Sequence, residues 1–316
     1  MTSIKTRLRV AVLLALLTAI STGVSVAPAA AASKTAEPSA NCNPLAMEGA
    51  ETFTLFGGAA ARGTDAREPD PDGVHEELPA SAKGKAGKNF RRTVPVWFHV
   101  VSDGAIGDIS NQVVQDQMSV LNLAFAGFYG GANTGFSFRL AGVTRTNNAA
   151  WHYGAISGND AHAMKRALHR GGPETLNIYA TTASAYLGWA FLPDIVTKPG
   201  QEYLDGIVVD WESMPGASTT YAGRYDLGHT ATHEAGHWFN LEHTFFGGCN
   251  AKGDFVDDTP AQRGPSSGCP VGADTCREEG LDPIHNYMDY SYDSCYWEFT
   301  AGQTQRMRDA WLLWRE

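Results

Sequence analysis

The sequence of 316 residues predicts one α/β domain that occupies positions 89 to 316. Within that range, apolar residues first follow strand-like and helix-like spacings in alternation, which is typical of α/β domains. The last quarter is irregular and contains four of the five cysteines. By contrast, positions 33 to 88 are rich in Ala, Gly, Pro and charged residues, a composition that cannot bury a core.

The predicted elements follow from apolar spacing. Four apolar segments predict strands: 94–100, 136–140, 176–180 and 206–210. Apolar residues three or four apart predict a helix that Ser110 caps, with a core-facing stripe of Val114, Met118, Leu121, Phe125 and Phe128. Three further helices are predicted: 161–170, 226–239, and a last helix that opens at Thr300 and carries Trp311 and Leu312.

The N-terminus has the order of residues found in a secretory signal peptide, which we assign to positions 1–32. Basic Lys5, Arg7 and Arg9 precede an apolar run at 10–20 and a stretch of small residues at 27–32. The apolar run is shorter than the ~20 residues that cross a bilayer, so an uncleaved membrane anchor is the less favoured alternative. We therefore expect a secreted, extracellular protein without stable membrane association once the signal is removed.

Positions 33–88 are predicted to form a pro-segment or linker, and the basic stretch from Lys83 to Arg92 is a candidate place for its proteolytic removal. The net charge of -10 disfavours non-specific binding to nucleic acid. No heptad seam for an oligomer is present, so a monomer is expected.

Cysteine usage indicates an oxidised C-terminal part. Cys249, Cys269, Cys276 and Cys295 should form two disulfides outside the cell, and their spacing alone leaves three pairings open. A zinc site built from these cysteines is disfavoured, because no close Cys-x-x-Cys pair is present. Cys42 is left over.

The segment from 233 to 243, HEAGHWFNLEH, predicts a catalytic zinc site. His233 and His237 are four residues apart, so a helix directs both imidazoles at one ion. Glu234 can reach a water bound to that ion without being a ligand. Catalytic zinc takes three protein ligands, and His243 is the natural third if the chain turns near Asn240. His229 lies four residues before His233 and is a weaker candidate, because three histidines on one straight helix converge poorly.

The zinc segment, together with TFFGGC, DFVDDTPA and DPIHNYMDYS, resembles the pappalysin family of metzincin metallopeptidases, in particular its short secreted bacterial and fungal members. The resemblance extends from about Arg92 to the C-terminus. It implies a metzincin-like α/β (α+β) domain with a mixed twisted sheet, an active-site helix and a disulfide-rich, mostly irregular C-terminal part. It also implies a zinc-dependent endopeptidase that acts on protein or peptide substrates.

The resemblance assigns further roles. Met288 matches the methionine turn beneath the zinc, and Tyr290 matches a tyrosine that approaches the metal or the reacting carbonyl oxygen. The family pattern pairs Cys249 with Cys276 and Cys269 with Cys295. Structural calcium, known among such enzymes, has its candidate ligands in one acidic stretch, for which an ordinary solvated turn is the alternative: Asp254, Asp257, Asp258 and Thr259.

One position departs from the family pattern. Asn240 stands where metzincins mostly have Gly, because the turn to the third histidine needs a positive φ, which Asn also tolerates. We expect a small cost in stability without loss of the site. Residues 187–191 resemble the edge strand over the cleft, where an extended substrate can pair by strand addition. Taken singly, Trp189 and Phe191 are expected to pack in the core.

The expected mechanism uses a zinc-bound water whose proton Glu234 takes and then delivers to the leaving amine. Tyr290 is expected to donate a hydrogen bond to the developing oxyanion. A Cys42 thiolate on the zinc would keep a zymogen latent, with an incidental free cysteine as the alternative. Two other functions stay open: a zinc hydrolase acting on a non-peptide bond, and a non-catalytic binding protein on the same scaffold.

Overall fold

A computed structural model describes residues 75–183, 186–250 and 253–316. The predicted signal peptide, the predicted pro-segment up to residue 74 and Cys42 lie outside the described residues. Within the described ranges, no helix combines the length and the apolar character that crossing a membrane requires.

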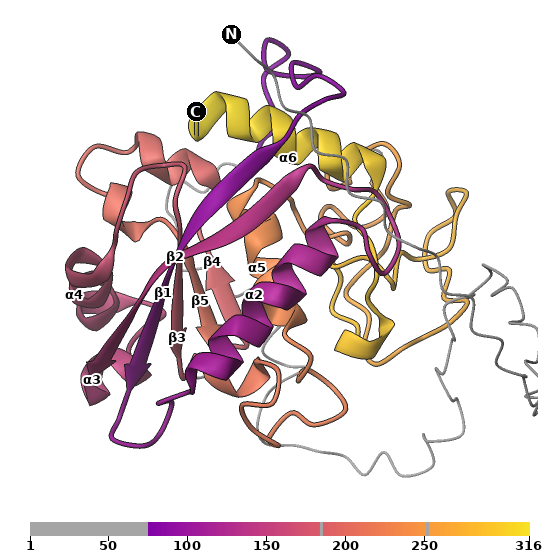
Figure 1. The fold of residues 1–316 in the computed structure, drawn as a ribbon. Helices are drawn as coiled ribbons and strands as arrows, with labels where there is room; N and C mark the ends of the chain where they lie inside the picture. The colour runs from indigo at the N-terminus through magenta and orange to yellow at the C-terminus, as the bar shows by residue number, and fades with distance from the viewer. Residues whose placement is uncertain (1–74, 184–185, 251–252) are drawn as a thin grey trace, which may run out of the picture. The chain divides into compact units, whose positions relative to one another are not determined.

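The centre of the fold is a five-stranded mixed sheet with the order β2-β1-β3-β5-β4 (Figure 1). Its strands are β1 Arg92–Ser102, β2 Phe136–Asn147, β3 Leu176–Thr181, β4 Gly188–Ala190 and β5 Ile207–Asp210. Strand β1 runs parallel to both β2 and β3, and β3 runs parallel to β5. Only β4 is antiparallel, and it forms the edge beside β5. Every residue of β3 and β5 is buried, as expected for parallel strands covered on both faces.

The helices lie on both faces of this sheet. They are α2 Asn111–Phe125, α3 Ala149–Tyr153, α4 Gly158–Leu168, α5 His229–Trp238 and α6 Ala301–Trp314. Short 3-10 turns connect other elements: Pro193–Thr197, Glu202–Leu204, Trp211–Ser213 and Asp293–Cys295. Helices α2 and α5 cover one face, and α3 and α4 cover the other (Figure 1).

Two apolar clusters hold the layers together. The larger joins β1, β3 and β5 to α2, α5 and α6, for example through Phe98, Leu121, Trp238 and Trp311. The smaller lies under α4, where Met164 packs with Tyr179, Val208 and Trp189. Trp189 is thus a core residue, as the sequence predicts. Because Ala231, Ala235 and Trp238 of α5 belong to the larger cluster, packing fixes the position of this helix.

The predicted mixed α/β class is confirmed, and each predicted strand and helix has a counterpart, although β2 continues seven residues beyond its predicted end at Leu140. The helical stripe was extended too far: α2 ends at Phe125, and Phe128 is 70% exposed. Helix α5 begins three residues later than predicted, because Gly228 takes a left-handed conformation with φ 85. Helix α3 was not predicted at all.

Buried side chains begin well before residue 89, where the domain is predicted to start. In the segment from His75 to Phe90, the apolar residues that pack inward are Leu78, Ala82, Ala86 and Phe90. The surrounding Lys and Gly residues give this stretch the composition of a linker, which conceals four apolar positions spaced four residues apart.

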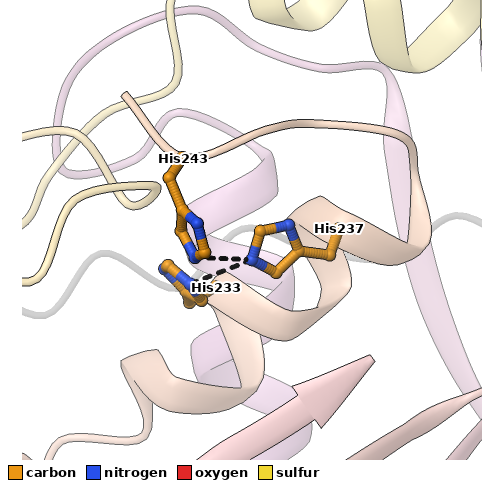
Figure 2. Close-up of side chains that lie close together, drawn as sticks. All are labelled: His233, His237 and His243. Carbon is orange, nitrogen blue, oxygen red and sulfur yellow. Dashed lines mark hydrogen bonds between the residues drawn. The ribbon is translucent and has the colours of Figure 1, made fainter. Parts of the chain in front are cut away.

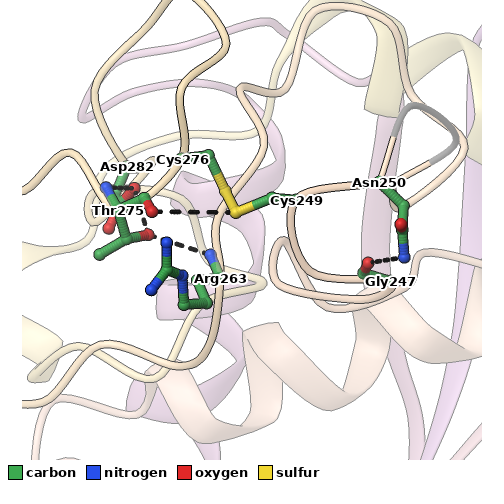
Figure 3. Close-up of a disulfide and its surroundings, with 7 residues drawn as sticks. All are labelled: Gly247, Cys249, Asn250, Arg263, Thr275, Cys276 and Asp282. Atoms are coloured by element: carbon green, nitrogen blue, oxygen red, sulfur yellow. Dashed lines mark hydrogen bonds between the residues drawn. A yellow bond between two sulfur atoms is a disulfide. The ribbon is translucent and has the colours of Figure 1, made fainter.

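The C-terminal part between α5 and α6 is mostly irregular and carries two disulfides, Cys249–Cys276 and Cys269–Cys295. This is the pairing that the family resemblance implies. Each closes a loop of 26 or 27 residues, which contributes about 3.5 kcal/mol in the chain-entropy model. Beside the first disulfide, the Thr275 hydroxyl accepts from the Arg263 backbone and donates to Asp282 (Figure 3).

Candidate metal centre

The histidine cluster is built from α5 and the turn that follows it. His233 and His237 lie one helical turn apart, and their Nε2 atoms are 3.1 Å from each other. After Trp238 the chain reverses through Asn240, whose φ is 76. The reversal brings His243 back, so that its Nε2 also lies 3.1 Å from that of His237 (Figure 2).

Hydrogen bonds on the opposite side of two rings fix their tautomers. His233 Nδ1 donates to the Tyr287 carbonyl at 2.6 Å, and His237 Nδ1 donates to the Leu241 carbonyl at 2.8 Å. A carbonyl only accepts, so Nδ1 carries the proton and Nε2 of the neutral ring offers a lone pair.

This donor set fits a zinc ion. Three nitrogens on a tetrahedral zinc lie about 3.3 Å apart, since each Zn–N bond is ~2.05 Å long. The observed separation of 3.1 Å is close to that value. A cation between the three imidazoles would stabilise lone pairs that otherwise face one another. His233 and His243 are buried and His237 is half-buried, which limits competition from solvent.

Met288, the predicted methionine of the turn, is fully buried and packs against α5 at Gly236. A Cβ added at Gly236 would overlap the Met288 sulfur, so the helix approaches the methionine closely only because residue 236 is glycine. The Thr244 N–H donates to the Met288 carbonyl at 3.2 Å. The methionine turn and the third histidine therefore hold one another in place.

Two further groups complete the cluster. The Tyr290 hydroxyl lies 3.0 Å from His243 Nε2. Glu234 faces the edge strand, where a Cβ built on Gly188 would lie 2.5 Å from its Oε1. Glu234 is only 6% exposed. The phenol of Tyr290 thus contacts the third histidine, and the carboxylate of Glu234, on the helix of the first two histidines, faces the edge strand β4.

Comparison with known proteins gives the family. The family model described as pregnancy-associated plasma protein-A, peptidase M43, matches residues 214–311. An extracellular metalloprotease of Arthroderma benhamiae is 47% identical over 230 residues, which cover 71% of this chain and 73% of the relative. The chain belongs to the pappalysin family of metallopeptidases.

Two other relatives agree with this assignment. A Verticillium alfalfae protein, also named extracellular metalloprotease, shares 42% identity with this pappalysin over 286 residues, 89% of this chain and 93% of the relative. Mature mirolysin of Tannerella forsythia, solved in complex with a cleaved peptide, is 30% identical with a TM-score of 0.56 and covers 69% of this chain and 90% of its own. The enzyme class of this pappalysin is therefore that of the zinc metalloendopeptidases.

A buried polar network supports the cluster in this pappalysin. The Thr244 hydroxyl donates to Gln262 at 2.8 Å, and the Gln262 amide donates to Asp289 at 3.1 Å. Burial raises the pKa of the Asp289 carboxyl, although hydrogen bonds from Ser266 and Gln262 oppose that shift. The network ties the residue after His243 to the residue before Tyr290. Sequence reasoning missed Gln262, since no motif marks a residue that acts across 27 positions.

His229 is separate from the histidine cluster. Among the described residues, the groups whose ligand atoms approach within 4.8 Å are His233–His237–His243 and Cys249–Cys276–Glu278. The two cysteines of the second group form a disulfide and are not available to a metal. The His229 ring instead packs beside Tyr287, with centroids 5.1 Å apart.

Two of the predicted calcium ligands, Asp258 and Asp254, have different partners in the structure. The Asp258 carboxylate accepts from Thr300 Oγ1 at 2.6 Å and from the Gly302 N–H at 2.8 Å, so it caps α6. Asp254 is buried, accepts from the Val256 N–H, and has its pKa raised to about 7 by burial. In the described part of the chain, these aspartates are not among the groups of three close ligands. Calcium binding here stays a prediction of the resemblance.

Proposed function

We propose that this pappalysin is a secreted zinc-dependent endopeptidase that hydrolyses peptide bonds in proteins through a zinc-bound water activated by Glu234. The observation that carries the proposal is the convergence of the Nε2 atoms of His233, His237 and His243, with Glu234 on the same helix, α5. A relative with 30% identity, mature mirolysin, is solved with a cleaved peptide, which favours peptides as the substrate class.

The three histidines would hold the zinc, which when bound lowers the pKa of a water and polarises the scissile carbonyl. Glu234 takes the proton of the attacking water and delivers it to the leaving amine. Its closeness to Gly188 of the edge strand supports this role, because a peptide paired with β4 would lie near the same strand. Tyr290 donates a hydrogen bond to the oxyanion.

Secretion is part of the proposal. Relatives at 42% and 47% identity are named extracellular metalloproteases, and the sequence begins with a signal-peptide pattern. The two disulfides suit an oxidising compartment. Latency through Cys42 stays a prediction, and comparing the activity of a Cys42→Ala precursor with that of the wild-type precursor tests it.

The deciding experiment compares the wild type with Glu234→Gln and with a matched control, Glu279→Gln, at an exposed position in the C-terminal part. Zinc per chain is determined for all three proteins, and casein cleavage is measured with and without a chelator. We expect one zinc in each protein. Cleavage should fall by roughly 10²- to 10⁴-fold in Glu234→Gln alone, as when a general base is lost.

Two results would contradict the proposal. A wild type that binds no zinc removes the three-histidine site, and a Glu234→Gln variant that cleaves at the wild-type rate removes the assigned base. Zinc-loaded wild type that cleaves no peptide after its leader is removed would favour a different hydrolytic reaction or a binding protein.

A further inference from the structure

The segment from His75 to Phe90 is fastened to α6. The backbone N–H groups of Gly84 and Ala86 donate to the two carboxylate oxygens of Asp309, at 2.6 and 2.9 Å. Asp309 is only 3% exposed, and Phe90 is buried in the main apolar cluster. Removing the segment would leave the Asp309 carboxylate and an apolar surface without these partners.

The start of the segment reaches the turn that carries the third histidine. His75 Nδ1 lies 2.8 and 2.9 Å from the carboxylate oxygens of Glu242, the residue directly before His243. Glu242 is 2% exposed, so its charge needs a partner inside the protein. The ring of His75 also packs beside Phe246, with centroids 5.1 Å apart.

Arg306 of α6 connects the same two parts of the chain. Its Nε donates to the Asn240 carbonyl at 2.7 Å, and its Nη2 donates to the Glu76 carbonyl at 3.2 Å. Arg306 is 6% exposed, and its charge lies near that of Glu242. One buried side chain therefore holds both the left-handed residue of the zinc turn and the first residues of the segment.

We infer that the segment His75–Phe90 is a retained part of the mature enzyme, that proteolytic removal of the leader ends at or before His75, and that Arg306 is a positioning residue for His243. This rests on the proposed zinc site. A cut within the basic stretch from Lys83 to Arg92 would remove both the His75 contact to Glu242 and the Glu76 contact to Arg306. The domain boundary thereby moves from residue 88 to a position before His75.

The boundary is tested on the full chain as it is secreted. N-terminal sequencing and the intact mass of the zinc-loaded protein give the mature N-terminus. We expect it at or before His75. A mature, zinc-loaded protein that begins after His75 overturns the inference, whether or not that protein cleaves casein.

The positioning role is tested by comparing Arg306→Met with Arg308→Met. Arg308 lies on the same helix and also donates to backbone carbonyls, those of Thr134 and Asn133, away from the zinc turn. Zinc affinity is measured by competition with a chelator, and Tm is measured for the metal-free proteins. Arg306→Met should weaken zinc binding by about 10-fold, the lower end of the range for residues that support metal ligands.

We expect Arg308→Met to lower Tm without changing zinc affinity, and Arg306→Lys to restore part of the affinity. Equal zinc affinity in Arg306→Met and Arg308→Met overturns the positioning role. Affinity and Tm are independent of turnover, so a protein that binds zinc but cleaves nothing challenges the proposed function and leaves this comparison interpretable. A wild type without zinc contradicts the proposed function, whereas the position of the mature N-terminus still decides the boundary.

Discussion

Asn240 shows how much one dihedral angle matters to the metal centre. Its φ of 76 allows the chain to turn from α5 towards His243. Asn tolerates this region better than other residues with a Cβ, but Gly enters it without cost. Among the described residues, Asn240 also has a buried amide nitrogen that lacks a hydrogen-bond partner. The position is therefore tolerated rather than optimal.

Replacement of Asn240 should follow this ranking. We expect Asn240→Ala to lower the free energy of unfolding by about 1–2 kcal/mol, because the Cβ of alanine clashes with the backbone in the left-handed conformation and no side-chain hydrogen bond offsets this. Asn240→Gly should equal or exceed the wild type, because it removes both the strain and the buried amide. Urea denaturation of the zinc-free proteins measures this, with Asn159→Ala at an exposed position of α4 as the control. An Asn240→Ala variant as stable as Asn240→Gly would show that φ is not what matters here.

Spacing predicted the residues of the site that lie close together along the chain, and the family resemblance added Met288 and Tyr290. Supporting contacts between distant residues outside these motifs were missed. His233, Glu234 and His237 follow from helical periodicity, and the structure brings His243 to them. Arg306 reaches Asn240 across 66 positions and His75 reaches Glu242 across 167. No periodic pattern encodes such pairs, because only the packed fold brings them together.

The end of α5 is held by a buried ion pair. Arg315 donates to Asp205 at 3.0 and 3.1 Å and to the Trp238 carbonyl at 2.8 Å. Its guanidinium also stacks over the Trp238 ring at 3.5 Å, while the indole N–H donates to Asp205. Arg315 and Asp205 are each 1% exposed at their side chains. The last turn of α5 is thereby anchored to the 3-10 turn Glu202–Leu204 and to the end of α6.

Breaking this pair should be costly. We expect Arg315→Met to reduce the free energy of unfolding by about 3–5 kcal/mol, because Asp205 is left as an unpaired buried charge. The double variant Arg315→Met with Asp205→Asn should recover a large part of that loss. Thermal and urea denaturation of the wild type, the two single variants and the double variant checks both statements. Additive losses in the double variant would show that the two side chains act independently.

Among the elements, the long periodic ones were predictable and the short ones were not. Ser110 and Thr300 mark helix starts as expected, since each hydroxyl accepts from the backbone of the first turn. The start of α5 was placed too early, because the break at Gly228 depends on Asp293, which accepts from the Leu227 N–H across 66 positions. Helix α3 is five residues long, too short for apolar periodicity to reveal.

At the scale of the whole molecule, a buried carboxyl at the end of β5 makes stability depend on pH. Asp210 is 1% exposed, and its pKa is raised to about 7 by burial, with a further contribution from the charge of Glu212. Its oxygens accept from the backbone N–H groups of Glu212 and Ala183. The folded state therefore binds this proton more tightly than the unfolded state does.

The sign of the effect follows from that difference. Stability contributed by protonated Asp210 is present below its ordinary pKa near 3.8 and is lost as the pH rises through about 7. Relative to Asp210→Asn, the wild type should lose at most about 4 kcal/mol between these limits. Urea denaturation of both proteins at about pH 5 and about pH 8 measures the difference. A difference that is the same at both pH values would mean that Asp210 keeps an ordinary pKa.

The two edges of the sheet are protected in different ways from pairing with other chains. Strand β2 is 12 residues long, and the unpaired backbone of so long an edge strand can pair with another chain. Two features oppose such pairing. The strand carries Arg139 and Arg145, and its register with β1 shifts between Val96 and Trp97. Strand β4 is only three residues long. That is enough main chain to align a short stretch of polypeptide and too little to seed sheet-to-sheet aggregation. In the proposed endopeptidase, so short an edge would offer main chain for pairing with a substrate and little for pairing between copies of the enzyme.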